Sequence, residues 1–178
     1  MIKKFTKRQL LDQCGFTTDE TQIILDYQKK LPILFKDNTD ALSTNARDLF
    51  TQLNGNNTKT KFTDWAKYNI VKQDYLIGTD YEEFYEKDGV RFETNGEGAQ
   101  KLSSMGVRKN YLLSIELAKE IAMFCGAALH AGKELKENSR LTRKYFILME
   151  KAVKRNAKWE LIRYPLRQGY KQMQKALD

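Results

Sequence analysis

The periodicity of residues 141–159 constrains the fold of this chain more than any other feature of its sequence. With an advance of about 100° per residue, the apolar residues of this stretch share one arc of a helix. That arc consists of Leu141, Tyr145, Leu148, Met149, Ala152, Val153 and Trp159. The opposite arc carries Arg143, Lys144, Lys151, Lys154, Arg155 and Lys158, with Ile147 and Glu150 among them. The spacing therefore predicts a long, basic, amphipathic helix that packs on a core through one side.

This helix is expected to end at Tyr164-Pro165, because proline disfavours the helical conformation of the residue before it. A basic helical tail follows, which carries Arg167, Lys171 and Lys175.

Positive charge is concentrated in the last third of the chain. Residues 1–40, 41–100 and 101–178 carry net charges of +1, −3 and +10. Residues 133–175 alone contain 13 basic and 4 acidic groups. An anionic partner is therefore expected to dock on this part of the molecule.

The first forty residues predict two short accessory helices. Residues 5–13 read as a helical segment that ends at Gly15, because glycine accepts the left-handed conformation of a helix end. Thr17 and Glu20 have the spacing of a capping box and open a second helix, which Pro32 ends.

The segment after Pro32 predicts a hairpin and then helices. The apolar run at residues 33–35, followed by a turn-rich tetrad, is interpreted as the first strand of a small hairpin. Asn45 is expected to cap a helix that stops at Gly55. A third helical segment is expected around residues 62–70.

The following fifty residues predict strands and one apolar helix. Aromatic residues among charges indicate a hairpin with its turn at residues 87–89. Residues 96–106 are expected to be flexible, and residues 110–113 to form a strand that leads into a helix. The apolar positions of that helix, from 115 to 129, cover a wide surface that should be buried.

These elements predict an α+β fold: a mostly helical single domain with small antiparallel β-hairpins, N-terminal accessory helices and the long basic C-terminal helix. The expected division is an accessory segment at 1–31, an α+β domain at 32–155 and a basic helical tail at 156–178. Cys14 and Cys125 are the only cysteines, and neither a secretory signal nor a membrane-spanning run of about 20 apolar residues occurs. A cytoplasmic location is therefore expected.

Four short motifs follow one another along the chain. They are NARDLF at residues 45–50, FTDW at 62–65 followed by GTDY at 78–81, NYLLS at 110–114 running into AKEIAM at 118–123, and RKYFI at 143–147 with Glu150. In this order they resemble the AntA/AntB antirepressor domain of bacteriophage regulatory proteins. The resemblance covers roughly residues 33–153. It implies an α+β domain that relieves repression by binding a phage or prophage repressor protein.

Residues within and beside these motifs are the candidate partner contacts. The set comprises Arg47, Lys119, Arg143, Lys144, Lys151, Lys154, Arg155 and Lys158. Arg47 and Arg143 have a structural alternative, which is to hold helices through carboxylates such as Asp48 or Glu150 or through strand carbonyls. The aromatic residues of the motifs are expected in the core: Trp65, Tyr111, Tyr145 and Phe146.

The basic arc has several possible explanations. It is either a solvated helix face or a docking surface for an acidic repressor surface, for DNA, or for the protein's own acidic middle segment in a homo-oligomer. The leading hypothesis is stoichiometric binding of a repressor, and the alternative is a DNA-binding regulator that uses the basic helix on phosphates.

Catalysis has little support in the sequence, and no cofactor or metal is expected. His130 is the single histidine, so neither a zinc site nor a Cys/His dyad can be assembled. Carboxylates at Glu82, Glu83, Glu86 and Asp88 could attract Mg²⁺, and Glu134 with Lys136 resembles a nuclease pair. Acidic residues on exposed hairpins are usually solvated, so an enzyme is not expected.

Overall fold

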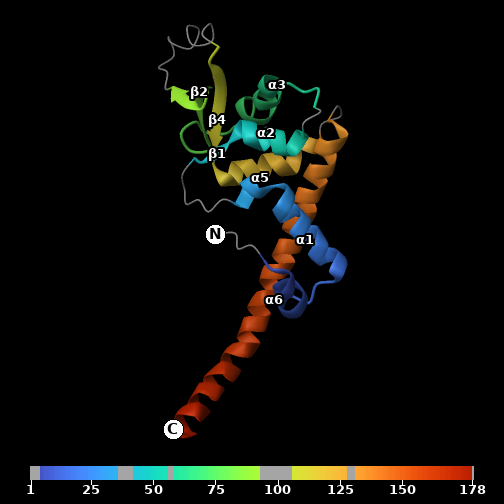
Figure 1. Cartoon of the computed structure of the whole chain (residues 1–178), viewed down its shortest axis with the longest axis vertical. Coiled ribbons are helices and arrows are strands. Elements are labelled where there is room, and N and C mark those ends of the chain that lie inside the picture. Colours follow the sequence, from blue (N-terminus) through green and yellow to red (C-terminus); the bar gives the residue numbers. More distant parts are fainter. Residues whose placement is uncertain (1–4, 36–41, 56–57, 93–105, 128–130, 178) are drawn as a thin grey trace. The chain divides into compact units, whose positions relative to one another are not determined.

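The structure is a computed structural model that describes residues 5–35, 42–55, 58–92, 106–127 and 131–177, with side chains of the last range described to 163 and at 173–174. The chain divides into two units, each with its own internal contacts. Unit 1 contains Lys30–Thr142, and unit 2 contains Lys3–Lys29 together with Arg143–Asp178. The predicted α+β class is confirmed (Figure 1).

Unit 1 contains a four-stranded antiparallel sheet with the strand order β1-β4-β2-β3. The strands are β1 (Thr44–Asn45), β2 (Tyr81–Lys87), β3 (Val90–Phe92) and β4 (Arg108–Leu113). Strands β2 and β3 form the predicted hairpin. Asp88 and Gly89 have φ angles of 50° and 80°, the pair of positive values that a two-residue type I′ turn requires.

Helical elements accompany this sheet in the described part of unit 1. They are η2 (Pro32–Phe35), α2 (Ala46–Asn54), α3 (Phe62–Ala66), η3 (Lys67–Val71), α5 (Ile115–Phe124) and η5 (Cys125–Ala127). Helix α2 contacts both β4 and α5, and the two helices lie side by side in Figure 1. The rings of Phe50, Phe62, Trp65 and Tyr111 form a cluster with neighbouring centroids 5.4–6.3 Å apart, so Trp65 and Tyr111 lie in the core as predicted.

The side chain of Asn45 connects the start of α2 with the sheet. Its Oδ1 accepts hydrogen bonds from the backbone N–H groups of Arg47 (2.9 Å) and Asp48 (3.3 Å), which confirms the predicted helix cap. The same oxygen accepts a third hydrogen bond from Nδ2 of the fully buried Asn110 in β4, at 3.0 Å. Asn110 Nδ2 also donates to Glu86 in β2, at 2.9 Å, and Asn110 Oδ1 accepts from Tyr111 N. One amide pair therefore fixes α2, β4 and β2 to one another.

The first turns of α6 (Lys133–Leu177) pack closely on the elements of unit 1. Nδ2 of the buried Asn138 donates to the carbonyl of Leu53 at 2.7 Å and so satisfies the C-terminal end of α2. Gly126 approaches so closely that a Cβ atom there would lie 2.5 Å from Ser139 Cβ and 2.9 Å from the Leu135 carbonyl oxygen. The close contact between η5 and α6 thus requires a glycine, which has no Cβ atom, at position 126.

Unit 2 combines the N-terminal helices with α6. Its elements are the π-helical turn η1 (Gln9–Gln13), α1 (Thr18–Lys30) and α6 from Arg143 onward. Gly15 has a φ of 60°, and Thr17 and Glu20 exchange hydrogen bonds with each other's backbone N–H at 3.1 and 3.2 Å, so both predicted end signals are confirmed. The rings of Tyr27 and Tyr145 stack with centroids 4.0 Å apart and form the centre of this unit.

Two predictions of local structure were wrong. Residues 33–35 form the 3-10 turn η2 rather than a strand, because Pro32 supplies the φ of a first helical residue and the turn buries all three apolar side chains. Helix α6 continues through Tyr164-Pro165 to Leu177, because a proline disfavours the helical conformation of the residue before it without excluding it.

Two apolar side chains predicted in buried arcs are exposed. Phe124 in α5 is 61% exposed and Val153 in α6 is 58% exposed, because each apolar arc is wider than the surface that packs against it. Residues 96–105 of the stretch predicted to be flexible lie outside the described part of the chain, and so does His130. Within the described part of the chain, no helix has the length and apolar character needed to cross a membrane.

We expect Asn110→Ala to lower the free energy of unfolding by about 3 kcal/mol, because it leaves Asn45 Oδ1 and the Tyr111 N–H short of a buried partner. Urea denaturation followed by circular dichroism measures this loss. Asn69→Ala is the matched control, since that amide makes a hydrogen bond to Trp65 of the neighbouring helical turn only. Equal losses in the two variants would contradict the connecting role of Asn110.

The second expectation concerns the contact of η5 with α6. Gly126→Ala should lower the melting temperature through a steric clash that costs about 1–3 kcal/mol, whereas Gly132→Ala, which meets nothing within 4 Å, should leave it unchanged or raised. Scanning calorimetry of both variants checks this. A Gly126→Ala protein as stable as the wild type would show that the backbones do not approach as described.

Candidate interaction surfaces

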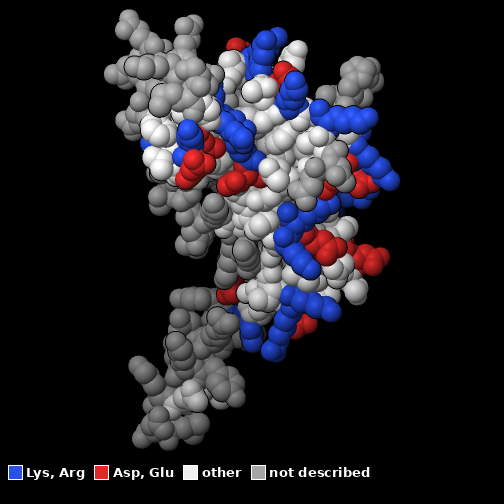
Figure 2. All heavy atoms as spheres, turned by 45° about the horizontal axis from the view of Figure 1, so that its top comes forward, with Lys and Arg blue, Asp and Glu red and all other residues white. Residues whose placement is uncertain are grey.

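The six cationic residues predicted on α6 are all exposed in unit 2. Five of them share an arc of about 100° with the exposed side chains of Ile147, Leu161 and Ile162. We call this set the basic face of α6; it consists of Arg143, Lys144, Ile147, Lys151, Lys154, Lys158, Leu161 and Ile162. Lys and Arg side chains also predominate over Asp and Glu on the described surface in Figure 2. The face spans roughly 28 Å from its first to its last residue.

The basic face contains little internal charge compensation. Lys154 Nζ lies 2.5 Å from Glu150 Oε1, and this hydrogen bond lowers the pKa of the Glu150 carboxyl below its ordinary value. Both side chains are exposed, so water and salt weaken their pairing. Among residues 143–159, Glu150 is the single acidic group.

Apolar side chains alternate with the cations on the basic face. Ile147 is 57% exposed, Leu161 75% and Ile162 61%. Ile147 lies about 21 Å along the helix from Leu161, so the basic face presents exposed aliphatic side chains near both of its ends.

Arg155, the sixth predicted cation, makes contacts inside unit 2. Its Nη1 donates to the carbonyls of Cys14 (3.1 Å) and Gly15 (3.2 Å), and its guanidinium lies 4.8 Å from the centre of the Phe16 ring. The side chain therefore holds the turn between η1 and α1 against α6.

Arg47 has the structural role that the sequence left open. Its Nη2 donates to the carbonyl of Lys109 in β4 at 2.6 Å, its Nε lies 3.5 Å from Glu86 Oε1, and its guanidinium stacks 4.1 Å from the centre of Phe62. It contacts a strand carbonyl and Glu86 rather than Asp48. Lys119 in α5 is half-buried, and burial lowers the pKa of its ammonium, opposed by Glu116. Arg47 and Lys119 belong to unit 1, whereas the basic face belongs to unit 2.

The acidic residues of the β2 strand have partners within unit 1. Glu82 pairs with Arg91 at 3.2 Å, Glu83 with Lys109 at 2.8 Å and Glu86 with Arg47. The described residues contain no cluster of His, Cys, Asp or Glu that could hold a metal ion. These carboxylates therefore stabilise the sheet and its neighbours.

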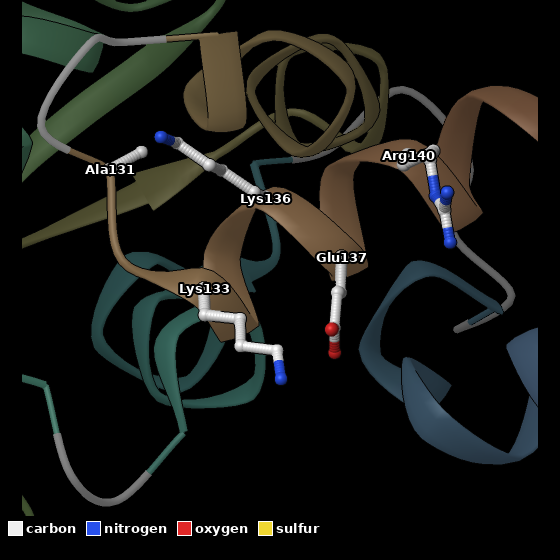
Figure 3. A pocket seen from close by; sticks show the side chains of 5 residues that line it. All are labelled: Ala131, Lys133, Lys136, Glu137 and Arg140. Carbon is white, nitrogen blue, oxygen red and sulfur yellow. The ribbon is translucent and has the colours of Figure 1, made fainter.

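Glu134 and Lys136 do not form a nuclease-like pair. The Glu134 carboxylate lies beside Gly55, where an added Cβ would collide with it. Lys136 instead borders an open hollow of about 440 Å³, together with Lys133, Glu137 and Arg140. In Figure 3 Lys133, Glu137 and Arg140 extend to the same side of the helix, whereas Lys136 extends towards Ala131.

Sequence reasoning missed one hollow in unit 2. It lies between η1 and α6, has a volume of about 660 Å³, and is bordered by Gln9, Gln13, Trp159, Ile162 and Arg163 among others. Trp159 is half-buried there although its helical position predicted a core residue. The sequence feature that could have indicated this hollow is the spacing of Trp159 and Ile162, which lie three residues apart and are therefore neighbours on the surface of a helix.

Comparison with protein families identifies one match. Residues 44–125 match the family model described as AntA/AntB antirepressor. No curated protein and no solved structure shows a significant match to the chain. The matched segment begins at β1 and ends with α5, so it contains the complete sheet and excludes the RKYFI segment at 143–147. Residues 44–125 of unit 1 are therefore the part of this chain that matches the AntA/AntB antirepressor domain.

Proposed function

We propose that the protein is a phage or prophage antirepressor that binds a transcriptional repressor through stoichiometric protein contact and so prevents the repressor from holding its operator. The family match supports the regulatory class. The observation that carries the mechanism is the basic face of α6, where exposed aliphatic side chains alternate with cations. The proposal includes no catalytic step, and it places the protein in the cytoplasm of the bacterial host.

The aliphatic residues favour a protein partner over DNA. Phosphate contacts need cations and hydrogen-bond donors, and an exposed isoleucine gains little beside a phosphate. Protein interfaces combine apolar with polar contacts, and the basic face offers both. Ile147, Leu161 and Ile162 are therefore the proposed apolar contacts, and Arg143, Lys144, Lys151, Lys154 and Lys158 the proposed charged contacts.

The protein's own acidic segment is a weaker candidate for covering the basic face. Glu82, Glu83 and Glu86 already pair with cations of unit 1. Binding a second copy through these residues would break those pairs and so lose part of its gain. Homo-oligomer formation stays a prediction, and it needs a surface other than these carboxylates.

DNA binding is the second candidate, supported by five cations along one side of a helix. Arg47 and Lys119 stay candidate partner contacts because both lie within the residues matched by the family model. Arg47 is the weaker candidate of the two, since its guanidinium already contacts the Lys109 carbonyl and Glu86. The two candidates differ in salt dependence. Phosphate binding weakens steeply with salt and tolerates many sequences, whereas repressor binding is selective for one protein.

Purification of the chain from its native host, followed by mass spectrometry, should identify the repressor. The purified repressor bound to its operator should then be released by an equimolar amount of the chain, measured by electrophoretic mobility. The double variant Lys151→Glu with Lys154→Glu should weaken repressor binding at least about tenfold, because the two new carboxylates repel an acidic repressor surface.

The control is Lys59→Glu with Lys61→Glu, which changes the net charge equally at exposed positions of unit 1. It should leave operator release unchanged. If instead the wild-type chain alone retards operator DNA at about 150 mM salt and no repressor co-purifies, DNA binding replaces the proposed function.

A further inference from the structure

The hollow between η1 and α6 has an apolar side formed by α6. Trp159 is half-buried and Ile162 is 61% exposed, and both border the same open space of about 660 Å³. The guanidinium of Arg163 lies 4.5 Å from the centre of the Trp159 ring, which keeps the indole in place. Gln9 and Gln13 of η1 border the other side. Tryptophan is one of the residue types enriched among the few residues that contribute most of the free energy of binding at protein interfaces.

The packing of unit 2 ends before this hollow. Tyr145 and Ala152 of α6 are fully buried, and Met149 between them is 9% exposed. Beyond them, exposure rises to 75% at Leu161 and 61% at Ile162. Both residues also belong to the basic face, so the hollow and the basic face are continuous along α6.

The charge around the hollow is positive. Residues 155–163 contain Arg155, Lys158 and Arg163 against Glu160. Asp12 borders the hollow from η1, but it is paired with Arg8 at 3.3 Å. An occupant must therefore be apolar towards Trp159 and Ile162 and negative towards Lys158 and Arg163.

This combination distinguishes three occupants. DNA offers negative charge along its backbone but only small apolar surfaces, so Ile162 would gain little from it. A second copy would bring an apolar surface with the same positive charges, which repel their counterparts. A partner helix with an apolar side flanked by carboxylates satisfies both requirements, and helices in apolar grooves are a recurrent mode of recognition.

We propose that the hollow beside η1 binds an acidic amphipathic helix of the partner protein, with apolar residues on Trp159 and Ile162 and carboxylates facing Lys158 and Arg163. The inference rests on the proposed function in taking the partner to be a protein. It adds the chemistry and shape of the segment that α6 recognises.

Synthetic peptides test the hollow without the repressor. The probe is a helical peptide of roughly 18 residues with leucines at i, i+3, i+4 and i+7 positions and glutamates beside them. Calorimetric titration of the full chain should show saturable binding. The fluorescence of the half-buried Trp159 should shift on binding, while Trp65, which is 3% exposed, should contribute no change.

Variants assign the binding to named side chains. Ile162→Ala should weaken peptide binding about fivefold, and Trp159→Ala at least about tenfold. Val153→Ala is the matched control, because Val153 is 58% exposed on another side of the same helix, and it should bind as the wild type does. A scrambled peptide of equal charge without an apolar side should bind at least about tenfold more weakly, and a lysine version should not bind.

Each of three results would overturn the inference: no binding of the acidic peptide, equal binding of the scrambled peptide, or a Val153→Ala variant whose binding is weakened as much as that of Ile162→Ala. Sedimentation that shows a dimer dissociated by Ile162→Ala would assign the hollow to a second copy, and duplex DNA binding lost in that variant would assign it to DNA. Peptide binding without operator release would contradict the proposed function alone, whereas operator release that is unaffected by Ile162→Ala would contradict the hollow alone.

Discussion

The pairing of Asn45 with Asn110 is the interaction on which unit 1 depends. Asn45 Oδ1 accepts from two N–H groups at the start of α2 and from Asn110 Nδ2, while Asn110 also bonds to Glu86. Because Asn110 is fully buried, water cannot replace these bonds, and each has a high cost when broken. The position of Arg47 follows from the same geometry, since this residue lies two positions after the cap and its guanidinium donates to the Lys109 carbonyl. The AntA/AntB segment is thus stabilised where a helix cap meets a strand.

The sequence predicted structure well where one or two neighbouring side chains decide it. The cap at Asn45, the capping box of Thr17 and Glu20, and the turn at Asp88-Gly89 all act within four residues, and all are found as expected. The predicted α+β class and the long C-terminal helix follow from periodicities of similar range. Interactions at short range need no knowledge of the tertiary fold.

Features that depend on distant neighbours escaped prediction. The sequence around Gly126 gives no local sign of the Ser139 side chain and the Leu135 carbonyl that lie against it. Arg155 resembles any other surface cation until the Cys14 and Gly15 carbonyls are placed beside it. The run at residues 33–35 is apolar at every position, so its periodicity could not separate a buried strand from a buried helical turn. Phe124 and Val153 were misplaced for the converse reason, because a helix can have more apolar surface than its neighbours cover.

Helix α6 has a surface that lies outside the residues matched by the family model, since the match ends with Cys125 and the basic face begins at Arg143. The role of this surface must therefore be argued from its own residues. Cations alone do not distinguish DNA from protein as a partner, because both can be anionic. The proposal of a protein partner rests on the exposed side chains of Ile147, Leu161 and Ile162, which a protein surface can cover with apolar groups of its own. The most informative residues of this basic helix are thus its uncharged ones.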